Sequence, residues 1–387
     1  MVQIPSNIKT IALSPQERGA ILNHAKYIER YYYDLVLNSS NGVIPLHEPD
    51  YLQFRAQIGQ EIEAANNPQI GDIFGHLYNR LSLNPVSKRL AEELSGRDYS
   101  TIEEYQHEAS RIMTEHNTRP DPEMGGLSPV QVSALMYSDW ESENCPLKLN
   151  HNLRIDELKN VPLFHNARLL LNTLIEMQGE PTATEKCGLL NRKITSRLID
   201  GLMLGKIDQV MLPILKQKSN TDEESLKTLQ ILRVVCQCAD LVHLRKNKYL
   251  VKKKYQYLLL HENAGKLYHQ LFTAYFRKYN LGYGDRIPEL EGIQATIGYI
   301  LYRIQKTLTE FTSVSTIIDR VFLPAVKKQL DSLPKFVKKE FAVRIRLLEP
   351  LEELGIIECR WEEVDKMPQI KEVRKTQLLD RFISFKF

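Results

Sequence analysis

Long apolar runs are missing from this sequence of 387 residues. No stretch of about 18 apolar residues occurs, which excludes a transmembrane helix, because such a helix needs about that length to cross the bilayer core. The first residues, from Met1 to Pro5, show neither the basic start nor the apolar segment of a secretory signal. The five cysteines are few, odd in number and scattered, which favours reduced thiols over a disulfide framework. We therefore expect a cytoplasmic protein without a membrane partner.

Motifs of known catalytic chemistry are missing as well. The sequence contains no G-x-S-x-G nucleophile elbow, no P-loop, no G-x-G-x-x-G after a strand and no H-E-x-x-H helix. We therefore predict no catalytic residue and favour a non-enzymatic protein. An active site assembled from residues that are far apart in the sequence stays an open alternative.

Metal-binding patterns are equally scarce. Cys236 and Cys238 lie two residues apart on a predicted helix, so their side chains point roughly 200° away from each other and cannot hold one ion. Asp72 and His76 have the i, i+4 spacing that could share a metal or a proton, but no third ligand is suggested nearby. A simple surface pair is the favoured interpretation. The sequence thus predicts neither a metal site nor a cofactor.

The charges are nearly balanced overall, with 51 Lys and Arg against 48 Asp and Glu, but they are unevenly distributed. Residues 1–120 contain 11 basic and 15 acidic residues, so the rest of the chain carries the basic excess. Within that remainder, residues 241–257 contain no acidic residue and several basic ones. Such a local concentration of one charge indicates an anionic partner. The basic residues of this segment are Arg245, Lys246, Lys248, Lys252, Lys253 and Lys254.

The first third of the chain, residues 1–118, is predicted to form a small helical bundle. Ser14 and Glu17 form a capping box with Pro15 at the first helical position, and apolar residues follow at helical spacing up to residue 38. The segment 117–126 is rich in proline and glycine, which predicts a linker or domain boundary. Further helices of the bundle are predicted at residues 49–65, 70–81 and 101–116.

Residues 119–262 are predicted to form a winged-helix-like domain. The elements occur in the order helix, extended piece, helix, helix and β-hairpin, which is typical of that fold. The two strands of the hairpin flank Asn247, a residue type that tolerates the positive φ of a tight turn. Residues 205–220 would then be an insertion between the second and third helices. The helices are predicted at 164–178, 191–203 and 221–239, and the strands at 241–244 and 248–251.

Residues 263–387 are predicted to form a C-terminal helical domain. After its last long helix, Gly355 leads into a strand at 356–361, and an acidic loop then precedes a strand-like end at 381–387. This order allows a second winged-helix-like unit. The helices are predicted at 264–279, 290–308, 314–330 and 337–354. The fold class is therefore mainly α, with a helical bundle and winged-helix-like (α+β) units that carry short β-hairpins.

Several short segments resemble a loosely defined group of uncharacterised bacterial proteins. Some members of that group carry a SEC-C metal-binding tail or lie beside a plasmid-encoded reading-frame domain. This chain has no terminal Cys/His cluster, so the resemblance does not imply zinc binding here. It implies a fold and a bacterial origin rather than an activity. The segments are 126–129 with 135–138, 182–184 with 190–193, 279–290, and 374–376, and they span about two thirds of the chain.

The basic hairpin and the helix before it form the candidate binding site. Lysine and arginine on a wing can neutralise phosphates, and we assign this contact to the six basic residues of segment 241–257. Lys227, Gln230 and Arg233 share one face of the preceding helix, where they could contact base edges in a groove. The favoured function is therefore nucleic-acid binding, with DNA ahead of RNA.

Two other interpretations of the hairpin stay open. The same wing could dock an acidic protein surface, which would make the protein an interaction scaffold. The lysines could also be solvated charges that protect an exposed sheet edge from pairing with another chain.

Overall fold

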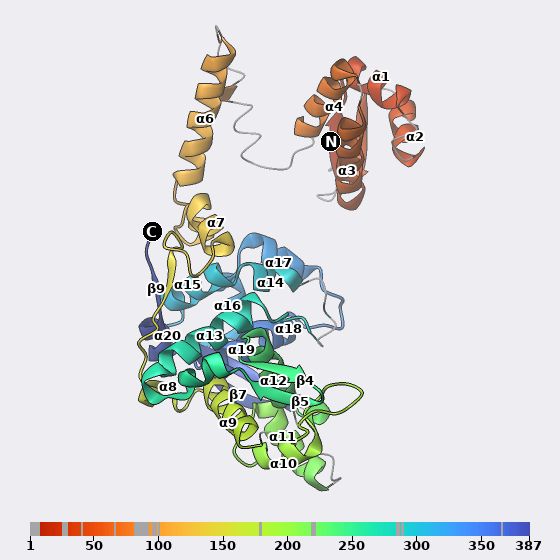
Figure 1. Ribbon diagram of the computed structural model, residues 1–387. Helices are drawn as coiled ribbons and strands as arrows, with labels where there is room; N and C mark the ends of the chain where they lie inside the picture. Colours follow the sequence, from red (N-terminus) through yellow and green to blue (C-terminus); the bar gives the residue numbers. More distant parts are fainter. Residues whose placement is uncertain are drawn as a thin grey trace. The chain divides into compact units, whose positions relative to one another are not determined.

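The computed structural model describes residues 8–24, 30–39, 42–65, 67–80, 93–94, 99, 101–177, 180–217, 222–283, 287, 290–364 and 367–387. The chain folds as two compact units, Met1–Asn117 and Thr118–Phe387. Both are mainly helical, with short antiparallel β-sheets, as the sequence predicts (Figure 1). No described helix has the length and apolar character needed to cross a membrane.

The first unit combines helices with a two-stranded antiparallel ladder that the sequence did not predict. The Ser14–Glu17 capping box is confirmed at the start of α1, and two helices replace the single helix predicted up to residue 38, with residues 25–29 outside the described part. Strands β1 and β2 bury alternate side chains such as Ile11 and Ile44. The elements are β1 (Ile8–Ala12), α1 (Pro15–Asn23), α2 (Arg30–Asn38), β2 (Val43–His47), α3 (Glu48–Ala64), α4 (Pro68–Arg80) and α6 (Ile102–Thr118).

The second unit begins with the helices that lead to the basic hairpin. The predicted insertion at 205–220 contains a helix of its own, and the helix predicted from residue 221 begins only at Lys227, after a single 3-10 turn. The elements are α7 (Pro129–Tyr137), β3 (Leu147–Leu149), α8 (Ile155–Leu158), α9 (Pro162–Glu176), α10 (Arg192–Leu198), α11 (Lys206–Gln217), α12 (Lys227–Cys238), β4 (Val242–Arg245) and β5 (Lys248–Val251).

The β4–β5 hairpin forms where the sequence predicts it. Arg245 pairs with Lys248 at its tip, and the two-residue turn between them consists of Lys246 and Asn247. Both turn residues have positive φ values, 49° and 57°, as the tightest class of hairpin turn requires. Asparagine accommodates this backbone easily, which explains why the turn lies here.

The C-terminal part differs from the sequence prediction mainly in its strands. The strand predicted at 356–361 extends to Val364 and pairs with a second strand, β8, so the expected acidic loop is largely sheet. The end predicted as a strand at 381–387 is helical through Phe382, and only Ile383–Phe385 is a strand. The elements are α13 (Ala264–Arg277), α14 (Glu291–Ala295), α15 (Ile297–Thr307), β6 (Thr312–Ser313), α16 (Val314–Val321), α17 (Pro324–Asp331), α18 (Lys339–Val343), a π-helical turn (Arg344–Leu348), α19 (Glu349–Glu353), β7 (Ile357–Val364), β8 (Met367–Lys375), α20 (Gln377–Phe382) and β9 (Ile383–Phe385).

One hydrophobic core extends through the second unit, from Leu127 to Ile383. Strand β9 pairs antiparallel with β3, so the last strand of the chain is fixed to the start of this unit. Helix α13 is buried along most of its length and packs against α8, α9 and α12 (Figure 1). The segments before and after residue 262 therefore share this core, and the separate domains proposed for 119–262 and 263–387 stay a prediction.

Candidate functional site

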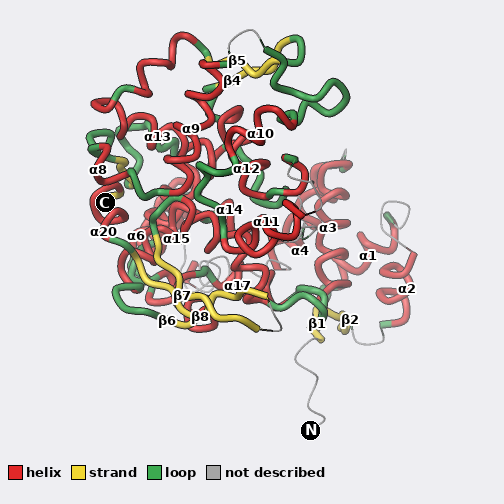
Figure 2. The backbone as a smooth tube through the Cα atoms, turned by 90° about the horizontal axis from the view of Figure 1, so that it is seen from below, coloured by secondary structure: helices red, strands yellow, loops and turns green. Residues whose placement is uncertain are grey.

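The basic hairpin lies at the periphery of the second unit, where Figure 2 shows its strands at the upper edge. The side chains of Arg245 and Lys246 at its tip are exposed, and so is Lys253 just after β5. No described residue forms an ion pair with any of these three cations. We call Arg245 and Lys246 the tip cations, whereas Lys253 lies at the opposite end of the hairpin, in the 3-10 helix after β5.

The hairpin is anchored on the extended segment that precedes α10. The Asn247 carbonyl accepts hydrogen bonds from the backbone N–H groups of Thr182 and Ala183, each at 3.0 Å. The buried Thr182 hydroxyl accepts a hydrogen bond from the Tyr249 N–H at 2.7 Å. The Tyr249 hydroxyl donates to the Gly188 carbonyl at 2.6 Å. These contacts hold the turn in a defined position, so its charges are presented by a fixed scaffold.

A buried ion pair lies directly beneath the hairpin. Glu223 is fully buried, and its Oε1 lies 2.6 Å from the Nε of Arg233. The Glu223 carboxylate also accepts a hydrogen bond from the Leu190 N–H, and Arg233 contacts the Tyr249 hydroxyl at 3.3 Å. Burial raises the pKa of the Glu223 carboxyl, although Leu190 and Arg233 partly offset this effect. The Arg233 guanidinium is thus bound to the interior, with 14% of its side chain exposed.

The other two residues assigned to groove contact also have partners within the chain. Lys227 Nζ lies 2.6 Å from Glu349 Oε2, and the Gln230 amide donates to the Glu224 carbonyl at 2.7 Å. Both side chains line a cavity of about 250 Å³ between α12 and α19. Base contact by Lys227, Gln230 and Arg233 therefore stays a prediction, because each side chain would have to release its partner within the chain to reach a base.

Glu353 is the group of this cavity that can exchange a proton near neutral pH. Its Oε2 accepts a hydrogen bond from the Tyr275 hydroxyl at 3.0 Å. Burial raises the pKa of the Glu353 carboxyl to about 7, with Lys227 lowering it and Glu349 raising it further. A carboxyl group of this kind in a pocket suits acid–base chemistry. The nearby charges of Lys227 and Glu349 are paired with each other, so they do not form a catalytic group together with Glu353.

The remaining lysines of the basic segment differ in exposure and in whether an acidic residue pairs with them. Lys252 and Lys254 both pair with Asp240, the residue just before the basic segment, and Lys254 Nζ lies 3.4 Å from its carboxylate. The hydrogen bond from Lys252 is the largest of the effects that lower the pKa of Asp240. Lys248 is partly exposed on β5. The six predicted phosphate contacts thus extend from the turn to the segment after β5, and the tip cations and Lys253 are the most available.

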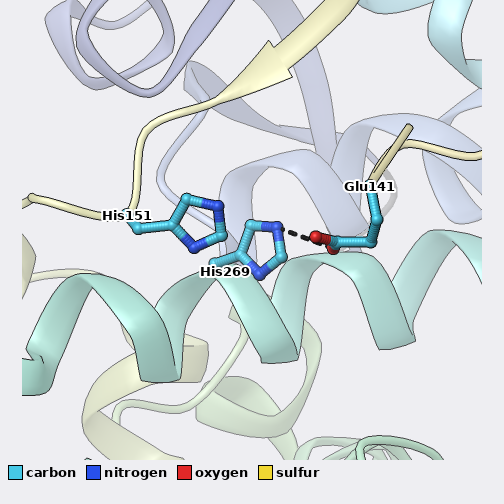
Figure 3. Close-up of side chains that lie close together, drawn as sticks. All are labelled: Glu141, His151 and His269. Carbon is cyan, nitrogen blue, oxygen red and sulfur yellow. Dashed lines mark ion pairs between the residues drawn. The ribbon is translucent and has the colours of Figure 1, made fainter. Parts of the chain in front are cut away.

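A second constellation, which the sequence did not suggest, joins Glu141, His151 and His269 (Figure 3). Glu141 belongs to the turn after α7, His151 to the turn after β3, and His269 to the middle of α13. Their ligand atoms all lie within 4.8 Å of one another. No short motif links three residues from such distant segments, so only the packing of the fold could reveal them.

The contacts within this cluster are close. His269 Nε2 lies 3.1 Å from Glu141 Oε1, and the two imidazole rings are 4.0 Å apart between centroids. His269 has 11% of its side chain exposed, whereas Glu141 and His151 are exposed. Burial, together with the neighbouring His151, lowers the pKa of His269 to about 4.

No family model, curated protein or solved structure matches this sequence. The geometry of the hairpin and of the two-histidine cluster is therefore the basis for inferring function.

Proposed function

We propose that this protein is a non-enzymatic nucleic-acid-binding protein that contacts phosphates through the β4–β5 hairpin. The observation that carries this proposal is the pair of tip cations, Arg245 and Lys246, exposed at a rigid turn without an acidic partner in the described part of the chain. Lys253, at the other end of the hairpin, is also exposed. Phosphate groups are the commonest polyanion that such a cationic tip can neutralise.

The order of elements around the hairpin supports a winged-helix-like unit. Helix α9, the bridged pair Ala183–Leu190, α10, α12 and the hairpin follow one another as helix, strand, helix, helix and wing. Helix α11 occupies the place of an insertion between the second and third helices. In this arrangement the hairpin corresponds to the wing, which in such folds can lie along a nucleic-acid backbone.

Phosphate contact is favoured over base recognition because the charged side chains of α12 already have partners within the chain. Arg233 is held by buried Glu223, and Lys227 is held by Glu349. Releasing Arg233 would leave a carboxylate buried without its partner, which costs several kcal/mol. The proposal is therefore binding with little sequence preference, to duplex DNA ahead of RNA.

A charge-reversal experiment tests this proposal. The tip variant replaces Arg245 and Lys246 by Glu. A control variant replaces Lys159 and Lys335, two exposed lysines elsewhere in the same unit, by Glu and has the same change in net charge. Binding to a fluorescently labelled duplex at low salt is measured by anisotropy. We expect the tip variant to lose at least tenfold in affinity while the control loses much less, because only the tip lies on the contact surface.

Two results would count against nucleic acid as the partner. One is the absence of duplex binding by the wild type at low salt. The other is an equal loss in the tip and control variants, which would indicate attraction by overall charge only. Recovery of a defined acidic protein in a pull-down that resists nuclease, and is lost in the tip variant, would favour the interaction scaffold instead.

A further inference from the structure

We propose that Glu141, His151 and His269 bind one divalent transition-metal ion of the zinc class. Two imidazoles and one carboxylate are a ligand set that Zn²⁺ accepts, with metal–ligand distances of about 2.0–2.2 Å. Two such ligands on one tetrahedral ion are separated by roughly 3.3–3.6 Å. The 3.1 Å between His269 Nε2 and Glu141 Oε1 is close to this separation.

His269 and Glu141 are held together by the packing of α13. Trp140, next to Glu141, is buried, and its ring packs on Phe272, one helical turn after His269. Arg277 covers the same indole ring at 5.4 Å. The backbone that carries Glu141 is therefore fixed beside the helix that carries His269.

His151 is brought to the same place by an unusually close backbone approach. Gly265, one turn before His269 on α13, lies so near the turn that an added Cβ would be 2.2 Å from the His151 carbonyl oxygen. Asn150 binds the Phe382 carbonyl through its N–H at 2.8 Å and accepts a hydrogen bond from the Asn152 N–H at 2.9 Å. Both sides of His151 are thus tied to the fold, which reduces the entropy lost on binding an ion.

The position of the His269 imidazole suits a metal ligand, because its Nε2 faces the Glu141 carboxylate across 3.1 Å. Coordination through Nε2 requires the ring proton on Nδ1, and an ion bound by both groups would lie between Nε2 and the carboxylate oxygen.

The exposure of the cluster indicates how an ion would reach the site and which further ligand the ion could bind there. Glu141 and His151 face solvent, so the ion has a direct path, and both side chains can rotate to complete the set. Three protein ligands leave a fourth tetrahedral position for water, as in sites that are not purely structural. Nitrogen ligands disfavour Mg²⁺ and Ca²⁺, which prefer oxygen.

Metal titration of the full chain tests the proposal. Chelator-treated protein is titrated with Zn²⁺ by calorimetry and with Co²⁺ by visible absorption, with Mg²⁺ as the ion expected not to bind. We expect one equivalent of Zn²⁺ and a Co²⁺ spectrum of nitrogen and oxygen ligands without a thiolate charge-transfer band. The site variants are Glu141→Gln and His151→Ala, both at exposed positions. The matched controls are Glu143→Gln and His261→Ala, also exposed and outside the cluster.

The variants distinguish metal binding at the cluster from adventitious metal binding elsewhere on the protein. Each site variant should weaken Zn²⁺ affinity at least tenfold, and the double variant should abolish the Co²⁺ spectrum, while both controls keep wild-type values. Wild-type protein that binds no Zn²⁺, or site variants that bind it as tightly as the controls, would overturn the proposal. A thiolate band that vanishes on alkylation would also overturn it, because the ion would then be on cysteine. None of these outcomes depends on nucleic-acid binding.

Discussion

Individual residues of the candidate sites depend strongly on partners that lie far away in the sequence. The position of Arg233 on its helix predicts contact with a groove, but its guanidinium is held by Glu223 and Tyr249. Lys252 and Lys254 share Asp240, one position outside the basic segment 241–257. Helical spacing predicts which face a side chain occupies, whereas ion pairs of this kind require the three-dimensional fold.

Glu353 gives a residue-scale prediction for pH dependence. Its pKa is raised from 4.5 to about 7 by burial, so between these pH values the folded protein keeps a proton that the unfolded chain has lost. Stability is therefore lost as the pH rises through this window, by an amount on the order of 3 kcal/mol. Glu353→Gln cannot ionise and should lack this component.

The free energy of unfolding at pH 4.5 and pH 7.5 checks this prediction. Both tryptophans, Trp140 and Trp361, lie in the second unit, so their fluorescence reports on the unit that contains Glu353. We expect wild type to lose stability relative to Glu353→Gln as the pH is raised. An identical pH dependence in the two proteins would show that this carboxyl is not buried in protonated form.

At the scale of elements, the hairpin depends on the segment that precedes α10. Thr182 is buried, and its hydroxyl is the acceptor for the Tyr249 N–H of β5. Thr182→Val keeps the shape but leaves that N–H without its partner, which should cost about 1–3 kcal/mol of stability. Urea unfolding followed by tryptophan fluorescence measures this, with Ser196→Ala on the exposed face of α10 as control. A variant as stable as its control would show that the anchor contributes nothing.

Local signals predicted the helices and the basic hairpin well. The Ser14 capping box and the Asn191 N-cap are found where the sequence indicates them, because caps use residues within three positions. Asn247 specifies the turn of β4–β5 in the same local way. The hairpin was therefore predictable from a few residues.

Strands that pair across long distances were harder to predict. Strand β9 depends on β3, more than 200 residues earlier, and β1 depends on β2 across two helices. The strand β8 has a proline near its start and mostly polar or charged side chains, a pattern that resembles a loop. The sequence pattern of a short segment does not reveal a pairing partner that lies so far away in the chain.

At the scale of the whole molecule, function was only partly predictable. The basic segment was visible as a break in a nearly balanced charge distribution. The Glu141, His151 and His269 cluster was not, because α13, the turn after β3 and the turn after α7 meet only in the folded second unit. Gly265 explains this convergence, since its missing side chain lets α13 approach the His151 turn.

Salt dependence of duplex binding tests phosphate contact by the hairpin most directly. Each neutralised phosphate contributes about 0.9 to the slope of log affinity against log salt, so the two tip cations predict a slope of about −2 or steeper. Replacing Lys246 by Ala should reduce the magnitude of that slope by about 1, because one phosphate contact is lost. A wild-type slope near zero, or a slope unchanged in Lys246→Ala, would contradict phosphate contact through the tip of the hairpin.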